Sequence, residues 1–123
     1  TTTMVEILSD MPTEVQNAIK AVDKKTLKGD GSGLETTSDK LFLLSLMECY
    51  GSVFYSNGYE EGAKYNYYEN NENRKMSSAW WLRGPSINNG NNKGIGFTQI
   101  VMSGLMGSGD ASYESGVVFG FCF

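Results

Sequence analysis

The chain has 123 residues and a formal net charge of −4, which suits one compact domain with a single core. It has no cluster of basic residues and no apolar run of about 18 residues, so we expect neither a nucleic-acid partner nor insertion into a membrane. The 15 glycines against 2 prolines favour short strands and tight turns, and an α+β fold class. The chain starts at Thr1 and has its first methionine at Met4, a pattern that fits an excised domain or a processed product.

Near the N-terminus, a proline and a set of apolar residues predict one helix. Pro12 suits a first helical turn, and Val15, Ala18, Ile19 and Val22 follow at helical spacing. We therefore expect a helix over about 12–22. The polar stretch 23–39 that follows contains three spaced glycines and is predicted to be an irregular loop.

A short apolar run, Leu41–Leu44, predicts a buried strand that leads into a short helix. Ser45 and Glu48 have the spacing of a capping box, in which each side chain bonds the other residue's backbone N–H. Gly51 can end the helix by adopting a positive φ.

The segment Ala79–Arg83 contains two adjacent tryptophans and is the strongest strand signal in the chain, with Gly84–Pro85 expected to end it. Successive side chains of a strand point to opposite faces. One tryptophan should therefore enter the core, while the other covers a second layer or a groove.

The C-terminal third is expected to combine strands with long irregular segments. Ser86–Gly96 is rich in Asn and Gly and predicts a loop, and 97–101 predicts a strand. Small residues dominate 103–115, whereas the apolar residues of Gly116–Phe123 predict a final core strand at a true C-terminus. We divide the single domain into a scaffold over 1–83, a display segment over 84–115 and a closing core strand over 116–123.

The sequence contains little that could support catalysis. Histidine is absent, which excludes the triads that need an imidazole base, and the paired glutamates lie in polar stretches typical of a solvated surface. Cys49 and Cys122 fit no metal-ligand spacing. We expect both thiols to be buried and unreactive, with a disulfide between them as the alternative. No enzyme activity, metal or cofactor is predicted.

Several motifs in order resemble one known family. They are Lys40–Ser45 with Glu48 and Gly51, Trp80–Pro85, Phe97 with Gly104, and Gly116–Cys122. The chain is similar to the C-type-lectin-fold variable proteins made by diversity-generating retroelements, which carry LFLLS…E, WWxRSP, FxxVxxxG and GVxFGFC in that order. The match extends over nearly the whole chain, although Gly84 stands where the family usually has Ser.

The resemblance implies a C-type-lectin-like fold, with short helices packed on small antiparallel sheets, and a variable surface that binds a receptor or another ligand. It also implies a location on a phage tail fibre or a cell surface. In this family, adenines of a template repeat are mutated during reverse transcription, so AAC codons can change to encode Val, Ser, Leu, Gly, Asp or Tyr. Seven positions fit this rule: Val101, Ser103, Leu105, Ser108, Asp110, Tyr113 and Ser115. Met102, Met106 and Glu114 cannot arise from AAC in this way.

The predicted ligand-binding residues combine an aromatic pair, flexible apolar side chains and carboxylates on a segment rich in glycine. They are Trp81, Gln99, Val101, Met102, Ser103, Leu105, Met106, Asp110, Tyr113 and Glu114, with Asn88 to Asn92 at the edge. The partner is an unknown protein or surface ligand. Other interpretations are a plain structural domain of a virion or surface protein, an enzyme of the formylglycine-generating type, and a calcium-dependent sugar lectin, although the motifs that such a lectin needs are missing.

Overall fold

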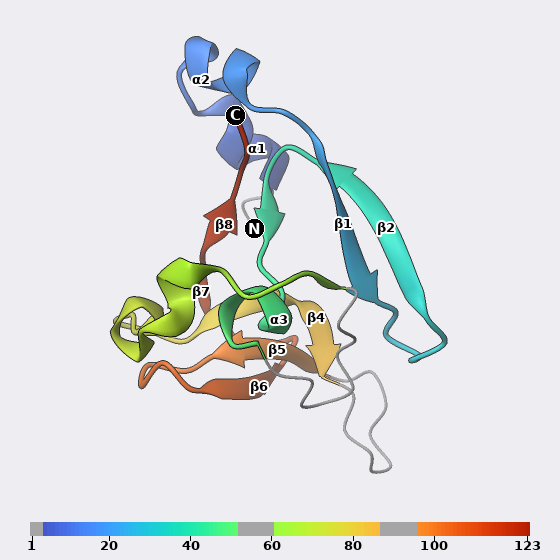
Figure 1. The fold of residues 1–123 in the computed structure, drawn as a ribbon, viewed down its shortest axis with the longest axis vertical. Coiled ribbons are helices and arrows are strands. Elements are labelled where there is room, and N and C mark those ends of the chain that lie inside the picture. The colour runs from blue at the N-terminus through green and yellow to red at the C-terminus, as the bar shows by residue number, and fades with distance from the viewer. Residues whose placement is uncertain (1–3, 52–60, 87–95) are drawn as a thin grey trace.

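The computed structural model describes residues 4–51, 61–86 and 96–123, and its fold class is α+β, as predicted (Figure 1). Short helices accompany small, mainly antiparallel sheets. The elements are α1 (Met4–Ser9), α2 (Thr13–Ala18), β1 (Val22–Leu27), β2 (Leu34–Asp39), β3 (Phe42–Leu43), α3 (Leu46–Cys49), the 3₁₀ helices η3 (Asn66–Glu69) and η4 (Asn71–Arg74), β4 (Trp80–Ser86), β5 (Gly96–Ile100), β6 (Met106–Asp110), β7 (Gly116–Val117) and β8 (Phe119–Gly120).

A four-stranded sheet in the order β6-β5-β4-β7 carries the core. β5 runs antiparallel to both β4 and β6, whereas β7 pairs with β4 in parallel. One face of the sheet is covered over β4 and β5, and Trp80, Leu82 and Ile100 from this face join α3 and β3 residues in one cluster. The core therefore lies between one face of this sheet and α3 (Figure 1).

The predicted strand and capped helix at residues 41–51 are confirmed in outline. β3 is shorter than the apolar run, but α3 starts with the capping box: the Glu48 amide donates to Ser45 Oγ at 3.1 Å, and the Ser45 amide donates to Glu48 Oε2 at 2.9 Å. Gly51 follows the helix with φ of 74°, a conformation that favours glycine. All four helical residues of α3 are buried, so the cap fixes an element of the core.

The predicted loop over 23–39 is wrong, because this stretch forms the β1–β2 hairpin. The two strands pair from Val22↔Asp39 to Leu27↔Leu34, and the Lys28 amide donates to the Gly33 carbonyl across the turn at 2.9 Å. β2 is largely exposed, so its sequence carries no apolar alternation. Strand formation here depends on backbone pairing and on threonines with high β propensity.

The predicted N-terminal helix is also too long. α2 ends at Ala18, and Ile19 adopts extended geometry with φ −71° and ψ 126°. The Lys20 amide then donates to the Cys122 carbonyl at 2.8 Å, in an isolated antiparallel bridge. This pairing with the end of the chain takes the backbone out of the helix before Val22, which begins β1.

Two boundaries in the C-terminal third also differ from the prediction. β4 continues through Gly84 and Pro85 to Ser86, with an irregular register between Trp81 and Pro85. The small-residue segment 103–115, expected to be irregular, contains β6, which pairs with β5 along its whole length. Glycine-rich composition suggested a loop, but here the glycines allow neighbouring side chains to cover the strand.

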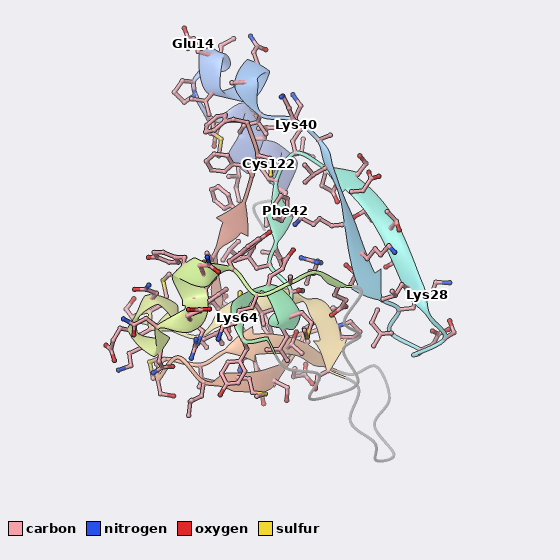
Figure 2. All side chains as sticks on the ribbon, viewed as in Figure 1. Glu14, Lys28, Lys40, Phe42, Lys64 and Cys122 are labelled. Atoms are coloured by element: carbon pink, nitrogen blue, oxygen red, sulfur yellow. The ribbon has the colours of Figure 1, made fainter. Side chains whose placement is uncertain are left out.

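The chain end forms two short strands instead of one core strand. Gly120 of β8 packs so closely against Phe42 that an added Cβ would lie 2.6 Å from the ring. Beyond it, Phe121 and Phe123 form an exposed edge-to-face pair, and Cys122 is exposed with a free thiol. Figure 2 shows Cys122 away from the four-stranded sheet, toward the end occupied by α1 and α2. The expected burial of Cys122 is therefore wrong, whereas that of Cys49 is confirmed, and burial raises the pKa of the Cys49 thiol.

Candidate ligand-binding surface

The outer face of the four-stranded sheet, opposite the core, carries a group of aromatic and polar side chains. In the strand register Trp81 lies opposite Gln99, and Gln99 lies opposite Gly107. Paired residues of antiparallel strands share a face, so Trp81, Gln99 and their neighbour Phe97 lie on the side away from Trp80. The rings of Trp81 and Phe97 meet edge to face, with centroids 6.5 Å apart. The prediction that one tryptophan enters the core while the other covers a second layer or a groove is confirmed for Trp80, which is 1% exposed. Trp81 lies on the opposite face and lines a pocket there.

A small apolar pocket adjoins this aromatic pair. It has a volume of about 180 Å³ and is lined by Leu43, Trp81, Leu82, Phe97 and Ala111. Its described lining residues combine two aromatic rings with aliphatic carbon, and none of them is charged. A pocket of this kind can receive an apolar side chain or a small apolar group of a ligand.

Two glycines of β6 form the floor of the outer face. A Cβ on Gly109 would lie 2.9 Å from Trp81 Cη2 and 3.1 Å from Gln99 Oε1. A Cβ on Gly107 would lie 2.8 Å from Val101 Cγ1. The side chains of Trp81, Gln99 and Val101 thus lie over β6, in space that a larger residue at position 107 or 109 would occupy.

The turn between β5 and β6 is held against η4. Gly104 has φ of 80°, and an added Cβ would lie 2.6 Å from Asn71 Oδ1. The Gly104 carbonyl accepts from Arg74 Nε at 2.9 Å, and the Ser103 carbonyl accepts from Asn71 Nδ2 at 3.1 Å. Backbone atoms therefore anchor this turn, and the side chains on it remain free to differ.

Arg74 acts as a buried anchor for several segments at once. Its guanidinium also donates to the Tyr68 carbonyl and to Asn71 Oδ1, and it lies 4.9 Å from the Tyr50 ring centre. The Arg74 carbonyl accepts from the indole N–H of Trp80 at 3.0 Å. One residue thus links the turn after β5 to the core.

The turn after β6 crosses toward β7. The Asp110 carboxylate accepts from the Ser112 amide at 2.8 Å, and the hydrogen bonds from Ser112 lower the pKa of Asp110. The Tyr113 amide donates to the Asp110 carbonyl at 3.0 Å, and Ser115 Oγ lies 3.3 Å from Gln99 Oε1. This turn therefore borders the outer face and directs Tyr113 into solvent.

The predicted binding residues fall into three neighbouring groups and two outliers. Trp81, Gln99 and Val101 belong to the outer face, Met102, Ser103 and Leu105 to the turn after β5, and Tyr113 and Glu114 to the turn after β6. Met102, Leu105 and Tyr113 are 62%, 50% and 67% exposed. Asn88 to Asn92 lie outside the described residues.

Met106 and Asp110 are the two outliers. In the register, Met106 pairs with Ile100 on the core side, and it packs against the core cluster. Asp110 pairs with Gly96 and shares that side of β6, although its carboxylate serves the turn. The structure therefore does not bring these two side chains together with Trp81 and Gln99.

A second feature, a polar pocket beside the β1–β2 hairpin, is not predicted by the sequence. Its volume is about 240 Å³, and it is lined by Asp23, Lys24, Lys25, Glu48, Glu61, Gly62 and Arg83. Of its charged residues, Glu48 and Glu61 are buried, Lys24 and Arg83 are half-buried, and Asp23 and Lys25 are exposed. The only early signal was the capping box, which places Glu48 on the first turn of a buried helix.

Glu48 is the centre of this polar cluster. Lys24 Nζ lies 2.8 Å from its Oε1, and Arg83 Nη1 lies 2.5 Å from its Oε2. The Ser45 amide and Tyr65 Oη contact the same carboxylate. Burial opposes ionisation of Glu48, but the hydrogen bonds from Arg83, Lys24 and Ser45 outweigh it and lower the pKa. With donors on both oxygens, Glu48 is suited to holding the fold together.

Within the described ranges, no helix is long and apolar enough to cross a membrane. The same ranges contain no group of three or more histidine, cysteine, aspartate or glutamate residues placed to hold a metal ion.

Comparison with known proteins identifies a family. Neither a curated protein nor a solved structure matches the chain. One family model, described as "Domain of unknown function (DUF6273)", matches residues 5–119. This range includes every strand of the four-stranded sheet and both turns of the outer face. The chain belongs to the DUF6273 family.

Proposed function

We propose that this chain is a ligand-binding domain of the C-type-lectin fold, and that the outer face of its four-stranded sheet and the two adjoining turns form the recognition surface. The observation that carries the proposal is the separation of this surface from the core. Exposed apolar side chains lie on turns whose backbone is anchored independently of them. Aromatic and apolar anchors surrounded by adaptable polar groups are typical of protein interfaces.

The second step of the proposal concerns variation. The seven positions that fit mutated AAC codons are all exposed or half-buried. Of the three positions that do not fit, Met102 and Glu114 are also exposed, and Met106 is half-buried against the core. A surface on which changes leave the core intact is what a diversifying retroelement requires. The ordered motifs and the α+β architecture support the fold assignment, and a phage tail fibre or a cell surface is the proposed location.

The fold assignment has its own test, because an experimental structure can be superposed on C-type-lectin domains. A different strand topology in that superposition would reject the fold assignment. The diversification step is tested by sequencing the DNA beside the coding region. A nearby template repeat that differs only at adenines, together with a reverse transcriptase gene, is expected. Their absence would favour the alternative, a non-diversified structural domain.

The binding role is tested with a displayed library. Randomising Val101, Ser103, Leu105 and Tyr113 together should leave most clones folded and yield binders to an unrelated target protein. A matched library at Trp80, Leu82, Thr98 and Ile100 should lose folded clones. If the first library loses folded clones as often as the second, or yields no binder, the proposed recognition surface is rejected.

A further inference from the structure

We propose that Glu61 is a proton-binding site that controls how firmly the segment 61–65 is attached to the β1–β2 hairpin. The proposal concerns the polar pocket and does not depend on the ligand-binding surface. It rests on where the Glu61 side chain is held and on which groups surround it.

Glu61 connects three parts of the molecule through its side-chain carboxylate and its main-chain carbonyl. Its side chain Oε1 accepts from the Leu27 amide, at the end of β1, at 2.7 Å. Its main-chain carbonyl accepts from Ser45 Oγ at 3.1 Å and from the Arg83 guanidinium. The contact with Leu27 thus joins this segment to the hairpin at the end of β1, and Lys24 Nζ joins it further along β1 by donating to Tyr65 Oη at 3.2 Å. The carbonyl contacts tie the segment to α3 and β4.

Among residues 4–51, 61–86 and 96–123, no donor reaches the second carboxyl oxygen of Glu61. Glu61 is 1% exposed, and this oxygen, Oε2, is buried with it. An ionised carboxylate buried in this way is costly, because water no longer solvates it. A proton removes the charge and requires no extra space, so it is the occupant that the geometry accommodates.

Three of the charged groups around the pocket, Lys24, Glu48 and Arg83, interact with one another. Lys24 and Arg83 both bind the Glu48 carboxylate, which also contacts the Tyr65 hydroxyl, and Arg83 reaches Glu61 through the main-chain carbonyl. Gly62 packs directly on the Glu48 side chain. In the described part of the chain, the titratable and charged groups at the pocket are Asp23, Lys24 and Lys25 from β1, Glu48 from α3, Arg83 from β4, Tyr65, and Glu61 itself.

These surroundings shift the pKa values of Glu61 and Glu48 in opposite directions. Burial raises the pKa of Glu61, with the charge of Glu48 adding to it and the contacts with Leu27 and Arg83 opposing it. The pKa of Glu48 is lowered, so Glu48 stays ionised while Glu61 titrates. The segment 61–65 is called closed when it is attached to the hairpin and open when it is detached. Because the closed segment holds the Glu61 proton more tightly than the open segment does, attachment is firmest at low pH. It weakens as the pH rises through the raised pKa.

Amide hydrogen exchange of the full chain, followed from pH 4.5 to 8, tests this coupling. After correction for the intrinsic exchange rate, protection of the Leu27 amide should fall with rising pH. The fall should reach about tenfold for each pH unit by which the Glu61 pKa in the closed segment exceeds that in the open one. Glu61→Gln keeps an acceptor for Leu27 but cannot ionise, so its protection should not change with pH. Glu35→Gln, on the exposed strand β2, should behave like the unmodified protein.

A ¹³C titration of the Glu61 carboxyl in the unmodified protein provides a measurement that does not depend on any variant. A midpoint above the ordinary value of 4.5 is expected. The proposal is overturned by a midpoint at or below 4.5, by Leu27 protection that does not change with pH, or by the same change in Glu61→Gln.

Discussion

The two faces of the four-stranded sheet are built from alternating residues of the same strands, yet they have opposite properties. Trp80, Thr98 and Ile100 are fully covered, whereas their neighbours Trp81, Phe97 and Gln99 lie on the outer face. The inner face is closed by α3 and β3. The outer face is bordered by two turns, and Ser115 of the turn after β6 reaches Gln99 on it.

This difference shows how the domain can keep its fold while its surface changes. Inner side chains are bonded to several elements, as when the Trp80 indole reaches the Arg74 carbonyl. Outer side chains such as Met102 and Leu105 lie on a turn that is fixed by its carbonyl oxygens and by Gly104. Stability and recognition therefore depend on different atoms of neighbouring residues.

The largest effect is expected for Trp80→Ala, and Trp81→Ala is the comparison for it. Trp80 is 1% exposed, so its loss should lower the free energy of unfolding by about 3–5 kcal/mol. Trp81→Ala should cost less than half as much, because its ring is only half-buried. Urea unfolding followed by circular dichroism measures both values, and equal costs would break the distinction between the two faces.

A large effect is also expected for Glu48→Gln in the polar cluster beside the sheet. The change leaves Lys24 and Arg83 buried without their carboxylate, and should cost about 3 kcal/mol at neutral pH. Because the folded-state pKa of Glu48 is lowered, its contribution is complete above the unfolded-state pKa and is lost as the pH falls through the folded-state value. The difference in unfolding free energy between variant and unmodified protein should therefore shrink in acid.

The control for this substitution is Glu72→Gln. Glu72 forms an exposed ion pair with Lys75 at 2.5 Å, and exposed pairs contribute little to stability. Its variant should match the unmodified protein at every pH. A Glu48→Gln variant that unfolds as the control does would show that the buried cluster does not stabilise the fold.

A smaller effect, about 1–3 kcal/mol, is expected for Gly109→Ala, which places a methyl group against the Trp81 ring and Gln99. The Trp81 indole signal in an NMR spectrum should shift. Gly29→Ala is the matched control, because nothing lies within 4 Å of the added Cβ. If neither variant moves the Trp81 signal, β6 does not form the floor of the outer face.

Much of the inner structure could be predicted from sequence because its signals are local. The capping box at Ser45 and Glu48 and the tryptophan pair depend on neighbours within a few residues. The β1–β2 hairpin could not be found in this way, since β2 is polar on nearly every side chain. The early end of α2 depends on pairing between Lys20 and Cys122, which are far apart in the sequence.

The candidate surface was predicted only in part, for a related reason. Composition indicated that the turns around Leu105 and Tyr113 would be exposed, and the structure places both side chains in solvent. Composition does not indicate that 106–110 is a strand, so the sequence alone predicts Met106 on the surface, whereas its side chain packs on the core. The polar pocket depends on Arg83 and Glu61 meeting across the fold, and no local pattern predicts that contact.

The smallest effects are expected on the turns, where neighbouring residues again provide the comparison. Leu105→Ala and Tyr113→Ala should each change the free energy of unfolding by less than about 0.5 kcal/mol, since both side chains are at least half exposed. Met106→Ala, one residue after Leu105, should cost about 2 kcal/mol because that side chain packs on the core. Thermal and urea unfolding of the three variants measure these values. A cost for Leu105→Ala as large as that for Met106→Ala would mean that the turn side chains contribute to the fold and cannot vary freely for recognition.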